Sequence, residues 1–146
     1  MIGIRRAVLA IGFVVPLLSG TAHAADSLYH RVGGYDALAA VTDQFVGSLV
    51  TDPEFASFFT GLSDDSKKRI RQNVVDLLCQ ATGGPCYYVG RDLKVAHTGL
   101  GITEKQWDDS VKIFGQILVK MKVGDQEQKD LAALVIPLKD QIVVAK

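Results

Sequence analysis

The side chains of this sequence that could do chemistry are few. Cys79, Cys86, His30 and His97 do not have the spacing of a structural zinc site. The sequence contains neither the Gly-x-Ser-x-Gly of a serine hydrolase nor a glycine loop that would cradle a phosphate. Cys79 has no basic neighbour in the sequence that would activate it as a nucleophile. His97 is therefore the residue whose chemistry we consider first.

His97 lies in an apolar stretch, with Leu93 and Val95 before it and Gly99-Leu100-Gly101 and Ile102 after it. A lone histidine is more often structural or exposed than a metal ligand, and composition alone leaves that alternative open. The apolar setting favours an axial ligand to haem iron. A neutral imidazole binds the iron, and an apolar wall keeps water away from the porphyrin. No Cys-x-x-Cys-His sequence is present for covalent haem attachment.

Residues 1–24 have the features of a secretory signal peptide. Arg5 and Arg6 form a basic start, an apolar run follows, and Ala22-His23-Ala24 ends the segment with small residues. We expect cleavage before Ala25, an exported and periplasmic protein, and a single domain over residues 25–146. The alternative is a retained membrane anchor, for which the apolar run is short, because a span takes roughly 20 residues.

Export has two consequences for the rest of the chain. Without Arg5 and Arg6 the 16 basic residues become 14, against 16 acidic ones. This slightly negative net charge gives no indication of binding to nucleic acid or to an anionic membrane. In an oxidising compartment, Cys79 and Cys86 can form a disulfide across Gly83-Gly84-Pro85, and this is the outcome we expect. Two free, part-buried thiols are the alternative.

The elements that must position His97 are helices. Apolar residues at three- and four-residue spacing predict helices over about Asp36–Val50 and Ser66–Ala81, a third beginning at Thr103, and a last over about Gln126–Val144. Thr103 and Gln106 form a capping box, and Pro137 should kink the last helix. Residues 90–101 form a loop or a short helix around His97. No segment alternates like a strand, so we predict an all-α fold.

Four stretches of the sequence, in this order and spacing, resemble the truncated haemoglobins of group I, globins with a two-over-two helical sandwich. The resemblance covers nearly all of the chain after residue 24. The stretches are Leu28-Tyr29-His30-Arg31-Val32-Gly33-Gly34, Phe55-Ala56-Ser57-Phe58-Phe59-Thr60-Gly61, Gly83-Gly84-Pro85 with Tyr88-Val89-Gly90-Arg91, and Val95-Ala96-His97-Thr98-Gly99-Leu100-Gly101-Ile102-Thr103.

The resemblance implies haem b as the cofactor and His97 as its proximal iron ligand. It places apolar residues around the ring: Leu93, Ile102 and Trp107 on the proximal side, and Phe45, Phe59, Leu77 and Leu78 around it. In sequence these residues would look the same as ordinary core. His30 falls in the opening segment, and we expect it to be exposed.

The sequence departs from the family pattern above the iron. The family usually has a tyrosine on the first helix and polar residues on the second, which donate hydrogen bonds to bound oxygen. Here these positions fall on Val46, Ile70 and Val74, which are all apolar. We therefore expect a pocket biased away from tight oxygen storage, unless Gln72 or Asn73 turns inward or a water lies over the iron.

The resemblance implies reversible binding of a diatomic gas (oxygen, carbon monoxide or nitric oxide) by a monomer or weak dimer. The alternative is an enzyme, a nitric oxide dioxygenase or a nitrogen-oxide reductase. Such an enzyme would need a separate reductase, because the chain has no flavin or nicotinamide motif. A haem-based sensor lacks an output domain here, and a helical protein without cofactor is the remaining possibility.

Overall fold

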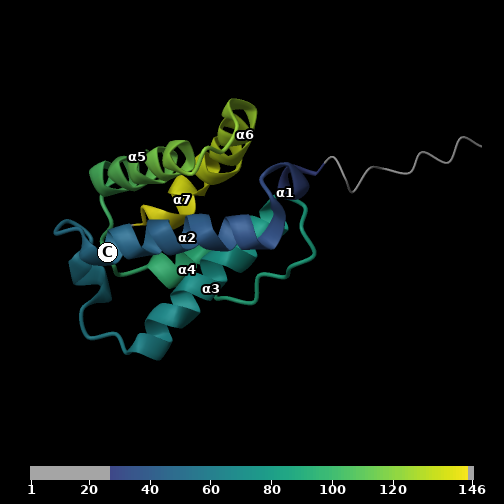
Figure 1. Cartoon of the computed structure of the whole chain (residues 1–146). Helices are drawn as coiled ribbons and strands as arrows, with labels where there is room; N and C mark the ends of the chain where they lie inside the picture. Colours follow the sequence, from purple (N-terminus) through teal and green to yellow (C-terminus); the bar gives the residue numbers. More distant parts are fainter. Residues whose placement is uncertain (1–26, 145–146) are drawn as a thin grey trace, which may run out of the picture.

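The computed structural model describes residues 27–144 (Figure 1). The predicted signal peptide lies outside this range. The described residues contain no strand, so the all-α prediction is confirmed. In chain order the helices are α1 (Leu28–Arg31), α2 (Gly34–Thr51), the 3-10 helix η2 (Ala56–Phe59), α3 (Asp64–Ala81), α4 (Leu93–His97), α5 (Glu104–Lys120), α6 (Asp125–Val135), the 3-10 helix η3 (Ile136–Leu138) and α7 (Lys139–Ile142).

Helix α2 lies at the centre of the molecule. It contacts α3 on one side and α5 on the other, and α6 packs beside α5 (Figure 1). The core between these layers is built from α2, α3, α5 and α6, where Leu38, Leu118 and Leu131 are 1–2 % exposed. Burial of such side chains is the main stabilising contribution, about 25 cal/mol per Å² of apolar surface.

Two of the long helices, α3 and α5, begin at a residue whose side chain caps them. The Ser63 side chain accepts a hydrogen bond from the Ser66 N–H, so α3 starts two residues before the predicted Ser66. The predicted capping box of Thr103 and Gln106 is present at the start of α5, with both of its reciprocal hydrogen bonds. Helix α1 was not predicted, because four residues are too few to show an apolar period.

The last predicted helix is interrupted rather than kinked. The α-helix ends at Val135, Pro137 lies in η3, and α7 resumes at Lys139. Proline has no N–H to donate to the helical hydrogen-bond ladder, and its ring clashes with the turn before it. The interruption lets α7 turn to contact α4, the helix that carries His97.

Cys79 and Cys86 form a disulfide, which confirms the expected bridge. Cys79 is fully buried at the end of α3, and Cys86 follows the Gly83-Gly84-Pro85 turn. Gly84 is required there, because a Cβ on this residue would lie 2.4 Å from the Tyr29 ring and 2.7 Å from the Cys79 sulfur.

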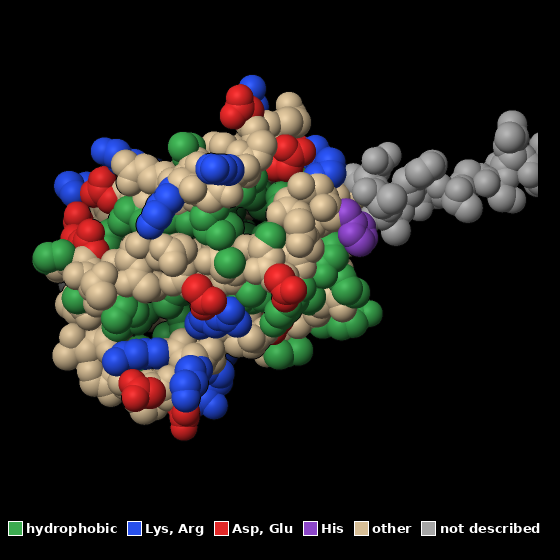
Figure 2. Space-filling view, viewed as in Figure 1, with side chains coloured by type: hydrophobic (Ala, Val, Ile, Leu, Met, Phe, Trp, Pro, Cys, Tyr) green, Lys and Arg blue, Asp and Glu red, His purple; other side chains and the backbone are tan. Residues whose placement is uncertain are grey.

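On the face shown in Figure 2, Lys and Arg side chains lie next to Asp and Glu side chains. Arg31 forms ion pairs with both Glu127 and Asp130. Within residues 27–144, none of the helices is both long and apolar enough to cross a membrane.

Candidate functional site

An apolar cavity of about 360 Å³ lies between α2, α3, α4 and α5. This volume is within the usual range of small-molecule and cofactor sites. Every residue that the sequence analysis assigned to the site lines this cavity: Phe45, Val46, Phe59, Ile70, Val74, Leu77, Leu78, Leu93, His97, Ile102 and Trp107. The structure thus brings these residues together, and their roles toward a cofactor stay predictions.

The sequence analysis missed other residues of the cavity wall. Phe55, Phe58, Tyr88 and Arg91 occur in the quoted motifs but had been given no role. The apolar positions of the C-terminal segment predict a helix, but their spacing does not distinguish a side chain in the core from one that lines a cavity. The remaining lining residues include Leu49, Asn73, Ala96, Leu100, Gln106, Ser110, Val111, Phe114, Val135, Leu138 and Ile142.

His97 is the last residue of α4 and its half-buried ring borders the cavity. The ring Nδ1 lies 2.7 Å from the Leu93 carbonyl oxygen. A carbonyl only accepts, so Nδ1 carries a proton, and in the neutral form of the ring Nε2 is the nitrogen with the free lone pair. The same kind of hydrogen bond orients histidine ligands in metal sites. Asp92 caps α4 by accepting from the Val95 N–H, which fixes the short helix that holds this ring.

The chain reverses directly after His97. Gly99 and Gly101 have φ values of +85° and +66°, a region that side-chain-bearing residues rarely adopt. Leu100 between them lines the cavity, as does Ile102 after them. The two glycines therefore return the chain to the cavity wall within a few residues of the imidazole.

Helices α2 and α3 contribute Val46, Ile70 and Val74 to the cavity lining, and their position above an iron stays a prediction. Val46 is 8 % exposed, and neither α2 nor α3 places a hydroxyl or a carboxylate on the lining. Of the two amides considered, Asn73 borders the cavity and has no hydrogen-bond partner among the described residues. Gln72 is not part of the lining, and its amide nitrogen donates to the Tyr35 hydroxyl at 3.0 Å and to Asp76 at 2.8 Å.

Gln72 belongs to a polar network that joins the outer faces of α2 and α3. Arg71 donates to both Asp43 carboxylate oxygens, at 2.7 and 3.0 Å, and to the Gln72 amide oxygen at 3.3 Å. The hydrogen bond from Arg71 lowers the pKa of Asp43 below its ordinary value, and the same pairing raises the pKa of Arg71. The network holds Gln72 away from the cavity.

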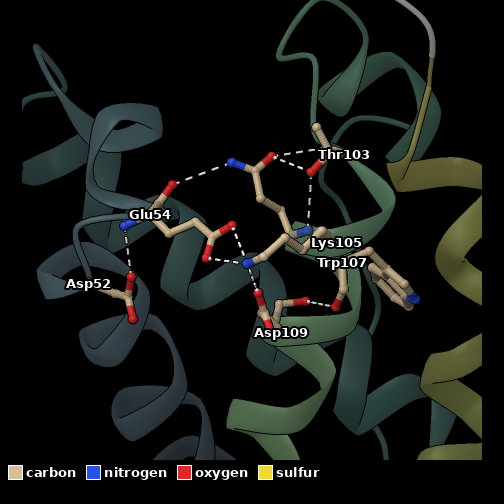
Figure 3. Close-up of polar contacts among 8 residues, drawn as sticks. Asp52, Glu54, Thr103, Lys105, Trp107 and Asp109 are labelled. Carbon is tan, nitrogen blue, oxygen red and sulfur yellow. Dashed lines mark hydrogen bonds and ion pairs between the residues drawn. The ribbon is translucent and has the colours of Figure 1, made fainter.

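Polar contacts also join residues 54–59, the phenylalanine-rich corner after α2, to the start of α5 (Figure 3). The Lys105 ammonium lies 3.0 Å from both carboxylate oxygens of Glu54 and 2.5 Å from Asp109. The hydrogen bonds to Asp109 and Glu54 raise the pKa of Lys105, and the same bond to Lys105 lowers the pKa of Asp109. Two cavity walls, the corner with Phe55 and the helix with Trp107, are thereby held together.

Tyr88 and Arg91 form the wall between α3 and α4. The Tyr88 hydroxyl donates to the Arg91 carbonyl oxygen at 2.6 Å, and burial of the ring, assisted by Asp92, raises the pKa of Tyr88. The Arg91 guanidinium has no ion-pair partner among residues 27–144. An unpaired cation at the border of an apolar cavity is suited to a ligand that has an apolar body and an anionic edge.

The families and proteins that this chain resembles are globins. The family model described as bacterial-like globin matches residues 27–144. A protein named group 1 truncated hemoglobin GlbN from Mycolicibacterium paratuberculosis is 28 % identical over 120 residues, covering 82 % of this chain and 86 % of the relative. A second GlbN, from Nostoc sp., is 29 % identical over 117 residues and covers 80 % of this chain and 97 % of the relative.

Solved structures share the arrangement of helices. The THB1 structure from Chlamydomonas reinhardtii has a TM-score of 0.69 at 27 % identity, covering 82 % of this chain and 98 % of that one. A truncated hemoglobin from Tetrahymena pyriformis, in its Fe(III) form, has a TM-score of 0.73 at 21 % identity, covering 82 % of this chain and 99 % of that one. The two-over-two sandwich expected from the sequence is therefore confirmed.

Proposed function

Because this chain belongs to the bacterial-like globin family, we propose that it binds a diatomic gas reversibly at a haem iron held by His97. The observation that carries the proposal is the imidazole at the cavity, with Nδ1 bonded to the Leu93 carbonyl and Nε2 free. The relatives are named as group 1 truncated hemoglobins, which supports haem as the cofactor and a gas as the ligand.

The residues present fit a haem. Its flat apolar ring matches a cavity walled by phenylalanine and aliphatic side chains, of which Phe55 and Trp107 are 5–6 % exposed. Its carboxylate-bearing edge matches the Arg91 guanidinium, which has no ion-pair partner within the described residues. When bound, the haem iron supplies an open coordination position for a gas.

The protein's own residues then have three tasks. Leu93 orients the His97 ring through its carbonyl oxygen, so that Nε2 is the nitrogen available to a metal. The apolar walls exclude water. Phe45, packed edge to face on Phe114 with ring centroids 5.5 Å apart, fixes the side of the cavity next to α5.

The wall opposite His97 determines the ligand preference that we propose. Val46, Ile70 and Val74 donate no hydrogen bond. Oxygen gains most from a donor, because it draws negative charge from the iron, whereas carbon monoxide and nitric oxide depend less on one. We propose that this chain holds oxygen more weakly than a relative with a donor at one of these positions.

The proposal is tested by absorption spectra of the full chain with haem, in ferric, ferrous and carbon-monoxide-bound forms. His97→Gly should lose the spectrum of a histidine-ligated globin, and added imidazole should restore it. His30→Ala is the matched control, because His30 is the other histidine within residues 27–144 and is exposed. Identical spectra for the wild type and His97→Gly without imidazole would show that another group binds the iron.

We also propose that residues 1–24 are a signal peptide and that the mature chain is periplasmic. The disulfide between Cys79 and Cys86 supports this, since disulfides persist in oxidising compartments. Expression of the full chain in a bacterium, followed by fractionation and mass measurement, should give a periplasmic product beginning at Ala25. A full-length product in the membrane fraction would indicate a retained anchor instead.

A further inference from the structure

One segment of the cavity wall is held by side-chain bonds rather than by regular structure. Residues 86–92, which we term the wall segment, join α3 to α4 and contain no helix or strand. Tyr88 and Arg91 of this segment line the cavity, while Tyr87 and Val89 are each 82 % exposed. The segment therefore has little buried surface of its own to keep it in place.

Two bonds tie the wall segment to α3 and a third closes it on itself, while Asp92 at its end caps α4. The disulfide ties Cys86 to the buried Cys79, the Tyr88 N–H donates to the Gln80 side-chain oxygen at 2.7 Å, and the Tyr88 hydroxyl donates to the Arg91 carbonyl oxygen. Cys79 and Gln80 are neighbours in the last turn of α3. The disulfide thus brings the segment to the place where Gln80 can bind Tyr88.

We propose that the thiol–disulfide state of Cys79 and Cys86 controls how firmly the cavity retains its haem. The oxidised pair keeps Tyr88 and Arg91 on the cavity wall, and the reduced pair releases them. This inference rests on the proposed function, since it concerns the same cofactor.

Reduction requires a dithiol. Its thiolate attacks the half-buried Cys86 sulfur rather than the fully buried Cys79 sulfur. The Cys79–Cys86 bond breaks, and the dithiol becomes a cyclic disulfide as it supplies two electrons and two protons. The protein is left with two thiols.

Release of the wall segment opens one side of the cavity without unfolding the helices around it. The disulfide closes a loop with a sequence separation of 7, and the entropy of closing such a loop corresponds to a factor of about 50 in the equilibrium between the held and the released segment. This factor is the upper limit for the effect of reduction on haem loss. After reduction, the remaining contacts of Tyr88 still hold the segment in part. We therefore expect haem loss to accelerate by less than this limit, about tenfold.

The test measures transfer of ferric haem from the full chain to excess apomyoglobin. The oxidised chain is compared with a chain reduced by dithiothreitol and then freed of the reagent without oxygen, and with Cys86→Ser, which leaves Cys79 as a buried thiol. We expect about tenfold faster transfer from both, and no further effect of dithiothreitol on Cys86→Ser. Equal transfer rates from the oxidised and reduced chains would overturn the proposal.

Gly90→Ala tests the wall segment while leaving the disulfide intact. A Cβ on Gly90 would lie 2.5 Å from the end of the Tyr88 side chain, so the ring must move. Haem transfer from this variant should also accelerate. If it stays at the wild-type rate, Tyr88 is not the contact through which the disulfide acts, and the proposal is wrong.

Hydrogen exchange of the haem-free chain provides a readout that needs no cofactor. Reduction should speed exchange at residues 86–92 and leave the amides of α5 unchanged. Faster exchange throughout the chain would mean a general loss of stability and would also overturn the proposal. If the oxidised chain takes up no haem at all, the proposed function fails first, and the absent globin spectrum distinguishes that result.

Discussion

Introducing a hydrogen-bond donor opposite His97 should convert this chain into a tighter oxygen binder. Val74→Gln places an amide on the α3 face that lines the cavity. A hydrogen bond to a charged group contributes about 1.5–3 kcal/mol, which corresponds to a ten- to hundredfold effect. Ordering the glutamine side chain costs up to about 2 kcal/mol, which offsets part of this gain. We therefore expect the lower end of the ten- to hundredfold range, with oxygen dissociating about tenfold more slowly.

The assay is stopped-flow oxygen dissociation from the ferrous protein, with carbon monoxide dissociation measured alongside. Val74→Met is the matched control, because methionine has a similar length and no donor. Carbon monoxide dissociation should change less than about threefold in both variants, because carbon monoxide depends less on such a bond. If Val74→Gln and Val74→Met slow oxygen dissociation equally, the effect comes from side-chain size, and the argument from the missing donor is refuted.

Three further predictions follow from individual side chains. Asn73 lies about a quarter-turn from the centre of the apolar face of α3, so Asn73→Leu should change the oxygen dissociation rate less than about threefold; a tenfold increase would show that its amide reaches the gas. The Thr42 hydroxyl is buried without a partner in the described part of the chain, so Thr42→Val should raise the free energy of unfolding by about 1 kcal/mol in urea titrations. Thr82→Val is the matched control, because the Thr82 hydroxyl donates to the Leu78 carbonyl oxygen at 2.7 Å, and its loss should lower the free energy of unfolding. A stabilised Thr82→Val would contradict the reasoning. Asp43→Asn should cost about 0.5 kcal/mol at pH 7, a small value because solvent and salt screen the exposed pair with Arg71. The pKa of Asp43 is lowered from its ordinary value of 3.8, so its contribution is complete above that pH and is lost as the pH falls through the lowered value. Urea titrations of both proteins from pH 7 to pH 2 should therefore converge at the acid end, and a gap that stays constant would refute the assignment.

The helices could be predicted where apolar period and end signals agree. Thr103 and Gln106 specify the start of α5 by themselves, because a capping box is a local interaction. The C-terminal segment could not be predicted as well. Pro137 indicates a disturbance of the helix, but the redirection of α7 onto α4 depends on tertiary contacts that no local pattern encodes.

The site could be predicted largely through the resemblance to a family. Without that resemblance, His97 could equally have been a structural or an exposed histidine, and the apolar lining residues could not have been distinguished from ordinary core. The arrangement of Tyr88 against Gln80 could not be anticipated, because a glutamine near the end of a helix shows no spacing rule that links it to a backbone N–H eight residues later. The same holds for Gln72, whose direction is decided by Tyr35 and Asp76.

Three of the polar side chains that border the cavity are engaged elsewhere, whereas Asn73 and Arg91 have no side-chain partner among the described residues. Ser110 donates to the Trp107 carbonyl, Gln106 belongs to the capping box of α5, and the Tyr88 hydroxyl donates to the backbone of the wall segment. Because Asn73 lies off the centre of the apolar face of α3 and Arg91 lies at the border, we expect the free lone pair of His97 to be the main polar feature offered to the interior. We expect a cavity built in this way to discriminate among gases by size and by the strength of the iron–ligand bond, since its wall carries no hydrogen-bond network that could adjust to the ligand. Stronger oxygen binding would accordingly require a new donor in the wall rather than the rearrangement of an existing one.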